Sequence, residues 1–158
     1  MIYIGNHLST TAGFAAMGKH ALALGEDTFA FFTRNPRGGK AKEIDPEDAK
    51  RLCDMLGEHG FGKLVAHAPY TMNLCSDKPE VRDFARRMLR LDLERMEYVP
   101  GNYYNFHPGS HVGHGAAAAI PMIADALKSV LTGDDGSLIP WRTTILLETM
   151  AGKGSEIG

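Results

Sequence analysis

Hydrophobic residues along the chain form short continuous runs, which alternate with longer segments where apolar residues recur every three or four positions. Short runs are typical of strands buried on both faces, and the longer period is typical of amphipathic helices. The pattern predicts five strands, at residues 2–4, 28–32, 63–66, 103–106 and 143–147, with four helices between them. Strict alternation of this kind predicts one α/β domain with a parallel sheet and right-handed crossovers.

Capping residues set the boundaries of the first two predicted helices. Ser9, Thr10 and Thr11 offer N-caps to the first helix, and Gly25 is expected to end it. Asp45 followed by proline begins the second helix.

The third and fourth helices are predicted from their apolar faces. The third begins at Pro79, and its inward side chains are expected to be Val81, Phe84, Met88 and Leu91. Its solvated face is expected to hold Arg86, Arg87, Arg90, Asp92 and Glu94. In the fourth helix Pro121 is compatible with helical structure only in the first turn. Residues 108–111, which precede that helix, are predicted to form a tight turn.

Three residues of the types that bind metals follow three successive predicted strands. His67, His107 and Glu148 each end such a run, at spacings of 40 and 41 residues. Because the carboxyl ends of parallel strands meet at one edge of a sheet, these side chains are expected to converge. Two imidazoles and a carboxylate suit zinc and leave a coordination position open for water or substrate.

The remaining histidines fall into two groups. His7 and His111 lie near strand ends, where they either support the ligands or contact phosphate, or play no part in the site. His20, His59 and His114 are predicted to lie on helix or loop surfaces, outside the site.

A basic loop follows the second predicted strand. It contains Arg34, Arg37, Lys40 and Lys42 with no acidic residue before Glu43. These cations either contact phosphates or form an ordinary solvated loop. Three residues after His67, Tyr70 is either a packing residue of its loop or an aromatic platform for a nucleotide.

Length and composition limit the classes of protein that fit. The chain has 158 residues, whereas a closed eightfold β/α barrel needs about 250. It contains neither a membrane-spanning apolar run nor the pattern of a signal peptide, so a cytoplasmic protein with reduced Cys53 and Cys75 is expected. The formal net charge of −2 provides no overall attraction to nucleic acid.

Five segments carry a resemblance to a known family. They lie at residues 3–9, 29–35, 67–74, 105–111 and 148–155. The segments Asn-Phe-His-Pro-Gly-Ser-His at 105–111 and Glu-Thr-Met-Ala-Gly-Lys-Gly-Ser at 148–155 are the most specific. In order, they resemble endonuclease IV, the zinc-dependent class of apurinic/apyrimidinic endonucleases on a TIM-like barrel. The resemblance covers the whole chain, and residues 1–158 are expected to be the N-terminal part of one such barrel, with its first five strands and four helices.

The resemblance implies a DNA repair activity and roles for several residues. His67, His107 and Glu148 correspond to ligands of a tri-zinc site, in which Glu148 bridges two ions and is the expected catalytic residue. Arg37 and Tyr70 correspond to residues that penetrate DNA at a flipped abasic site, and Arg34 is expected to bind DNA beside them. The reaction would be hydrolysis of the phosphodiester 5′ to an abasic site in double-stranded DNA by a monomeric enzyme. Clustered zinc ions would generate hydroxide, neutralise the phosphate and stabilise the leaving 3′ oxygen.

The resemblance also implies that the chain lacks part of the site. The family continues through three more strands that carry further ligands, so a fragment with one complete zinc shell, inactive by itself, is expected. Two other functions stay open. A sugar isomerase or epimerase on a related barrel would favour carboxylate-rich metal ligation and would not need the basic loop, and a truncated chain could bind metal or DNA without turnover.

Overall fold

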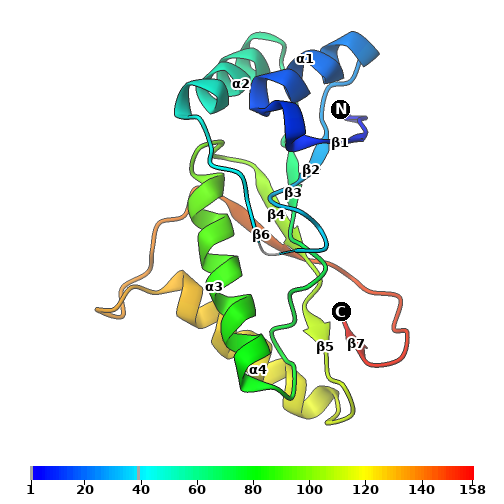
Figure 1. The fold of residues 1–158 in the computed structure, drawn as a ribbon, viewed down its shortest axis with the longest axis vertical. Helices are drawn as coiled ribbons and strands as arrows, with labels where there is room; N and C mark the ends of the chain where they lie inside the picture. The colour runs from blue at the N-terminus through cyan, green and yellow to red at the C-terminus, as the bar shows by residue number, and fades with distance from the viewer. Residues whose placement is uncertain (1, 39) are drawn as a thin grey trace.

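Five parallel strands form one sheet in the computed structural model, which describes residues 2–38 and 40–158 (Figure 1). In sheet order, they are β1 (His7–Leu8), β2 (Ala30–Phe32), β3 (Val65–His67), β4 (Tyr103–Phe106) and β6 (Thr144–Leu147). Their connections contain the short 3-10 helix η1 (Thr10–Ala12) and the helices α1 (Phe14–Leu24), α2 (Pro46–Glu58), α3 (Pro79–Met96) and α4 (Ala116–Leu131). The predicted α/β fold, a partial TIM-like barrel, is confirmed.

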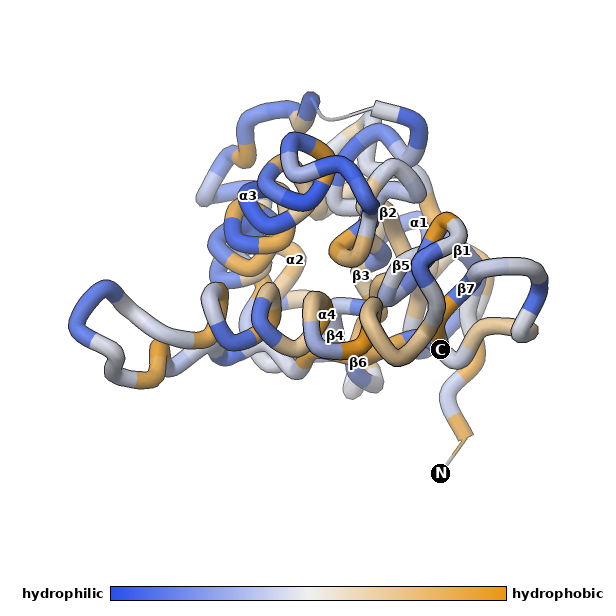
Figure 2. Tube along the Cα trace, turned by 90° about the horizontal axis from the view of Figure 1, so that it is seen from below, coloured by the Kyte–Doolittle hydropathy of each residue, from blue (hydrophilic) through white to orange (hydrophobic). Residues whose placement is uncertain are grey.

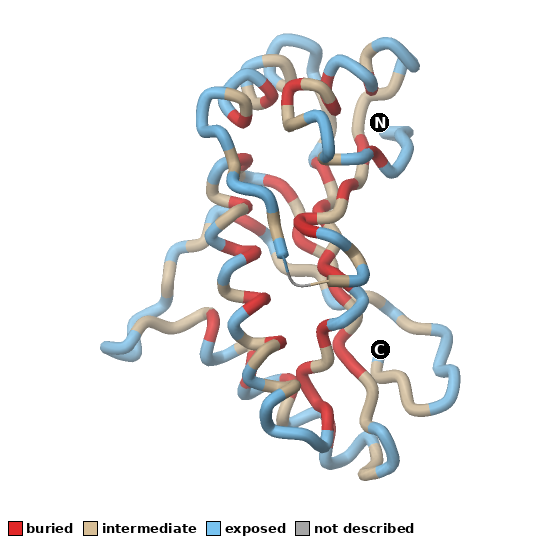
Figure 3. The backbone as a smooth tube through the Cα atoms, in the orientation of Figure 1, coloured by how far each residue is buried: buried red, intermediate tan, exposed pale blue. Residues whose placement is uncertain are grey.

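The sheet divides its side chains between two faces. Phe31, Ala66 and Tyr104 are almost wholly buried and join one core with the helices (Figure 3). Successive side chains of a strand point to opposite faces. Neighbours of these buried residues, including Phe32 and His67, therefore face the other side, where they stay partly exposed. Polar side chains at the strand ends can therefore lie on this second face without being buried in the apolar core.

Helix caps explain where the first two helices begin and end. Asp45 caps α2 by accepting a hydrogen bond from Glu47 N, as predicted. Gly25 ends α1 in the left-handed conformation, with a φ of 73°, which is also as predicted. Ser9 caps η1 instead of α1. The first N–H of α1, on Phe14, donates to Asp48 Oδ2 of α2 at 2.5 Å, which fastens the two helices together.

The prediction of a strand at residues 2–4 is wrong. Ile2 and Ile4 are 83% and 72% exposed, and the chain joins the sheet only at β1, where His7 lies opposite Ala30. The backbone of Ile4 instead exchanges hydrogen bonds with Asp27, in the turn before β2. Figure 2 shows this apolar N-terminal stretch projecting from the body of the protein.

The predicted inward face of α3 is partly wrong. Leu91 is 43% exposed, whereas Asp92, predicted to be solvated, is fully buried. The buried face of the helix consists of Ala85, Met88, Leu89, Asp92, Leu93 and Met96. Asp92 can lie in this otherwise apolar stripe because its carboxylate has hydrogen-bond partners on β4 and just after β2.

Two further predictions near α4 are wrong. Pro121 is the sixth residue of the helix, and the helix continues past it to Leu131 with the proline on its exposed side. The expected tight turn contains β5 (Gly109–Ser110), which pairs antiparallel with β7 (Glu156–Ile157). No helix in the described part of the chain is long and apolar enough to cross a membrane.

Asp92 is the centre of a buried hydrogen-bonded network. Its carboxylate accepts hydrogen bonds from Thr33 Oγ1 at 2.7 Å, from Tyr104 OH at 2.9 Å and from Arg34 Nε at 2.9 Å and Nη2 at 2.5 Å. The side chains of Arg34 and Asp92 are 3% and 0% exposed. Burial, followed by the charge of Asp92, raises the pKa of Tyr104 well above its ordinary value, so Tyr104 remains a donor. The network joins α3 to the end of β2 and to Tyr104 within β4.

Removal of the buried carboxylate should destabilise the fold strongly. Asp92→Ala should lower the free energy of unfolding by about 3–5 kcal/mol, because it leaves the buried Arg34 charge uncompensated. Replacing the pair together, as Arg34→Met with Asp92→Leu, should recover part of that loss. Urea unfolding followed by circular dichroism measures both effects.

The control for this prediction is an exposed ion pair. Lys50 and Asp54 form a pair on α2 with side chains 65% and 64% exposed, so Asp54→Ala should change stability little. If Asp92→Ala and Asp54→Ala unfold at the same urea concentration, the buried network does not stabilise the fold as described.

Candidate metal centre

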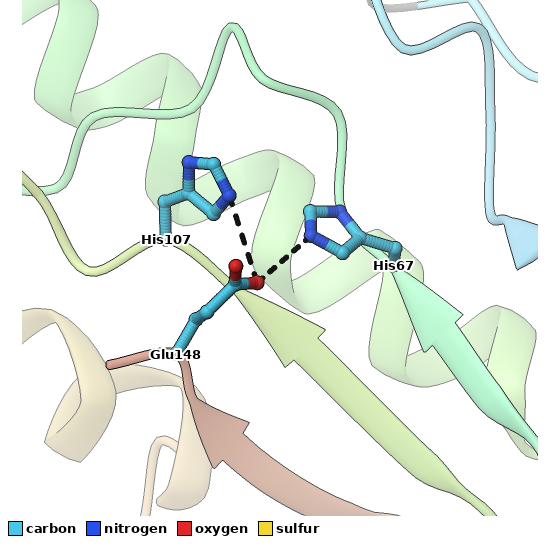
Figure 4. Close-up of side chains that lie close together, drawn as sticks. All are labelled: His67, His107 and Glu148. Carbon is cyan, nitrogen blue, oxygen red and sulfur yellow. Dashed lines mark hydrogen bonds and ion pairs between the residues drawn. The ribbon is translucent and has the colours of Figure 1, made fainter. Parts of the chain in front are cut away.

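Three side chains from adjacent strand ends meet at one point. His67 is the last residue of β3, while His107 and Glu148 directly follow β4 and β6 (Figure 4). One ligand atom from each lies within 4.8 Å of the other two. Glu148 Oε2 is 3.1 Å from His67 Nε2 and 3.6 Å from His107 Nε2. All three residues are partly buried, and no other group of this kind occurs in residues 2–38 and 40–158.

Hydrogen bonds fix which atoms His67 presents to the centre. Its Nδ1 lies 2.6 Å from the carbonyl oxygen of Ala68, which can only accept, so Nδ1 carries the proton. In the neutral ring Nε2 therefore directs a lone pair at Glu148 Oε2. Two acceptors 3.1 Å apart need a cation between them, either a second proton or a metal ion. This donor set fits a divalent metal of the zinc type.

Asn105 orients the carboxylate of Glu148. Its Nδ2 donates to Glu148 Oε2 at 2.5 Å. Burial opposes ionisation of Glu148. The hydrogen bond from Asn105, the hydrogen bond that His67 donates when Nε2 carries the second proton, and the charges of the nearby imidazoles outweigh burial and hold the pKa of Glu148 below its ordinary value. Glu148 is therefore a carboxylate, the form that binds metals.

Aromatic rings form one wall of the centre. The ring of Tyr70 lies 5.5 Å from that of His67 and 5.4 Å from that of His107. Phe32 lies 5.3 Å from both His67 and Tyr70. Tyr70 is nevertheless 58% exposed, so one part of the ring supports the imidazoles and the rest is open to a ligand.

Arg37 lies on a loop that is tied to Tyr70. Tyr70 N donates to the carbonyl of Pro36 at 3.0 Å, and Asn35 Oδ1 accepts from Arg37 N at 2.9 Å. The side chain of Arg37 is exposed. These contacts place the arginine's backbone directly beside the loop that carries Tyr70.

Arg34 does not share the exposed position of Arg37. Its guanidinium is buried and bound to Asp92. The sequence led us to expect a DNA contact from Arg34, but its side chain lies inside the fold. The other cations of the basic loop, Lys40 and Lys42, are exposed. Arg34 instead anchors the start of the loop, because it forms its ion pair two residues after β2.

The remaining histidines lie outside the ligand cluster. His7 is the first residue of β1, and its ring is 4.5 Å from that of Phe32. Burial and the neighbouring His67 lower the pKa of His7. His111 Nδ1 accepts hydrogen bonds from Gly113 N and Gly115 N, an arrangement that organises its own loop. His20 and His59 are exposed as predicted, whereas His114, predicted to be a surface residue, is half-buried.

Two asparagines that hold the centre together were not predicted from the sequence. Asn73 Nδ2 donates to Ser110 O at 2.9 Å, and Asn73 Oδ1 accepts from Ser110 N at 3.1 Å, which fixes the segment after His107. Asn105 could have been found by its position two residues before His107, since a strand has a period of two. Asn73 lies in a loop, and no spacing marks it.

Comparison with known sequences identifies the family. The profile of the Xylose isomerase-like TIM barrel family matches residues 19–158, and the chain belongs to that family. The chain is also 54% identical, over its full length, to a protein of Akkermansia muciniphila named probable endonuclease 4, of which it covers 55%. It thus spans about half the length of the curated relatives it matches.

Solved structures agree with this relationship. Endonuclease IV from Thermus thermophilus matches with a TM-score of 0.80 at 26% identity, over 99% of this chain and 55% of that one. The similarity to endonuclease IV expected from the sequence motifs is confirmed. A D-psicose 3-epimerase solved with D-fructose matches with a TM-score of 0.56 at 12% identity, over 81% of this chain and 47% of that one. That second likeness shows a shared fold alone.

Loss of the two histidines should abolish zinc binding. We expect the wild-type chain to retain about one zinc ion per molecule after gel filtration, and His67→Ala with His107→Ala to retain almost none, because the carboxylate alone is a weak ligand. Elemental analysis by mass spectrometry measures the content. His20→Ala with His59→Ala removes two exposed histidines and is the matched control. Equal zinc content in the two double variants would contradict the assignment.

Loss of the Asn105 amide should weaken zinc binding, and more so in acid. Asn105→Ala should reduce zinc affinity about 10- to 100-fold, the usual effect of losing a group that orients a ligand. It should also raise the pKa of Glu148, so that zinc is released at a higher pH as the solution is acidified. Competition with a fluorescent zinc indicator between pH 5 and 8 tests both effects. Asn6→Ala removes an exposed asparagine and should leave zinc affinity and the pH of zinc release as in wild type. If Asn105→Ala also releases zinc at the wild-type pH, Asn105 does not orient Glu148.

Proposed function

We propose that this chain is the N-terminal part of a zinc-dependent endonuclease that acts as a monomer on double-stranded DNA containing abasic sites. The proposed reaction is hydrolysis of the phosphodiester on the 5′ side of the abasic site. The observation that supports it most is the convergence of His67, His107 and Glu148 in a chain 54% identical to a protein named probable endonuclease 4. A bare fold likeness would not carry this proposal, because related barrels host different chemistries.

In this proposal His67, His107 and Glu148 hold the metal. A bound zinc ion supplies a Lewis acid that lowers the pKa of water and neutralises phosphate charge. His67 is kept in the binding tautomer by Ala68 O, and Glu148 is kept ionised and oriented by Asn105. The exposed part of Tyr70 offers a flat surface to a sugar or base beside the metal.

Arg37 and Tyr70 are the proposed DNA contacts. The ring of Tyr70 lies against the two metal-centre histidines, and Arg37 lies on the loop joined to Tyr70 by the hydrogen bond from Tyr70 N to Pro36 O. The exposed guanidinium of Arg37 can bind a phosphate or enter a groove. A sugar isomerase would not need this basic loop, so the exposed Arg37, Lys40 and Lys42 favour a nucleic acid substrate.

Chain length leads to a prediction about activity. In a nicking assay on a duplex with one abasic site and added zinc, the 158-residue chain should cleave very little. Its described residues form one three-ligand group, whereas clamping both the attacking and the leaving oxygen requires more than one ion. The same chain fused to the C-terminal part of the Akkermansia muciniphila relative should nick efficiently. Efficient cleavage by the unfused chain would show that one metal site is sufficient.

Substitutions at the proposed DNA contacts should affect DNA binding and leave zinc content unchanged. In the fused protein, Arg37→Ala should weaken binding to abasic duplex and reduce the slope of log affinity against log salt by about 1. Tyr70→Ala should cost about 1–3 kcal/mol of binding free energy without a comparable change in slope. Fluorescence anisotropy at several salt concentrations measures both, with the exposed Lys19→Ala on α1 as control. If Arg37→Ala and Tyr70→Ala bind like Lys19→Ala, the two loops do not contact DNA.

A further inference from the structure

A second candidate site is a groove lined by residues of α3 and of the C-terminal half of α4. Figure 1 shows these two helices on the same side of the sheet. The groove has a volume of about 350 Å³ and is lined by Arg86, Arg87, Arg90, Leu91, Ser129 and Val130. Half of these residues are arginines, and Leu91 is 43% exposed. The groove therefore combines guanidinium groups with an apolar surface, and it is separate from the strand ends that carry the metal centre.

The groove arginines have no acidic partner in the described residues. None of the three forms an ion pair within residues 2–38 and 40–158, although Asp83, Glu94 and Asp125 lie on the same two helices. Arg86 Nε is buried and has no hydrogen-bond partner in this part of the chain. A buried N–H without a partner is costly, and Arg86 is one of the residues that line the groove.

Packing holds one of these arginines in place. The guanidinium of Arg90 lies over the ring of Trp141 at 5.9 Å from its centroid, and Trp141 Nε1 donates to Val130 O at 2.9 Å. This contact links α3, α4 and the segment before β6. An arginine positioned in advance loses less side-chain entropy when it binds a ligand.

We propose that this groove binds an acidic peptide segment of a partner protein. Arginine pairs with carboxylates through two parallel hydrogen bonds, so two or three acidic residues of a peptide match the three guanidinium groups. An apolar side chain of the same peptide would pack on Leu91 and Val130. The sugar-phosphate backbone of a nucleic acid offers no group for that apolar surface, which favours a peptide. The net charge of −2 gives an acidic peptide no overall attraction, so binding must depend on the groove itself.

The test uses the 158-residue chain and a fluorescein-labelled pentapeptide of three aspartates followed by leucine and phenylalanine. Fluorescence anisotropy should give saturable binding to the wild-type chain, and Arg90→Glu and Arg87→Glu should each weaken it at least tenfold. Lys19→Glu makes the same charge change at an exposed site on α1 and should bind within twofold of wild type. Leu91→Ser, and a peptide with serines in place of leucine and phenylalanine, should each weaken binding severalfold. Far-UV circular dichroism verifies that each variant is folded, and Arg87, which is exposed, remains testable if Arg90→Glu unfolds.

Three results would overturn the proposal. The first is absence of saturable binding to the wild-type chain. The second is an equal loss of peptide affinity in Arg87→Glu and Lys19→Glu, which would show that binding depends only on the net charge of the chain. The third is direct, saturable binding of undamaged duplex DNA to the wild-type chain that Arg87→Glu abolishes and that displaces the peptide, which would make the groove a nucleic acid surface.

Discussion

The parallel register of β3, β4 and β6 is the constraint on which the candidate metal centre depends. His67 lies opposite Asn105, and Asn105 lies opposite Leu146, so the residues that end these strands leave the sheet at one edge. Neighbouring strands are about 4.8 Å apart, a distance that imidazole and glutamate side chains can span. A slip of β4 by one residue would turn Asn105 toward the helices and separate it from Glu148. The chemistry of the site is thus a consequence of strand pairing.

The buried carboxylate of Asp92 connects that sheet to the surface that we propose contacts DNA. It binds Arg34 at the point where the chain leaves β2, and from there the basic loop continues to the exposed Arg37. A second tie, from Tyr70 N to the carbonyl of Pro36, joins the loop to the wall of the metal centre. Two arginines three residues apart therefore have different tasks, since one fixes the loop and the other faces solvent.

Features that depend on local sequence pattern were predicted correctly. Features that depend on contacts between residues far apart in the chain were not. Alternation of apolar runs and helical periods was enough to predict the parallel order, and the three metal-type residues followed from their places after strands. Burial of Asp92 could not be predicted, because its partners come from residues about 60 positions earlier and 12 positions later. The apolar run at Ile2 and Ile4 suggested a strand, but the sheet accepts the chain only from His7 onward. Pairing of β5 with β7 depends on contacts 45 residues apart, such as that between Ser110 and Ser155.

In the proposed metal centre, two imidazoles and one carboxylate hold a single zinc ion. Zinc K-edge X-ray absorption of the chain loaded with one equivalent of zinc tests it most directly. The expected spectrum contains imidazole scattering from two nitrogens at about 2.0–2.1 Å and an oxygen shell at about 2.0–2.2 Å. A sulfur shell at about 2.3 Å, which would implicate Cys53 or Cys75, or a spectrum without imidazole scattering, would show that His67, His107 and Glu148 do not bind the ion together.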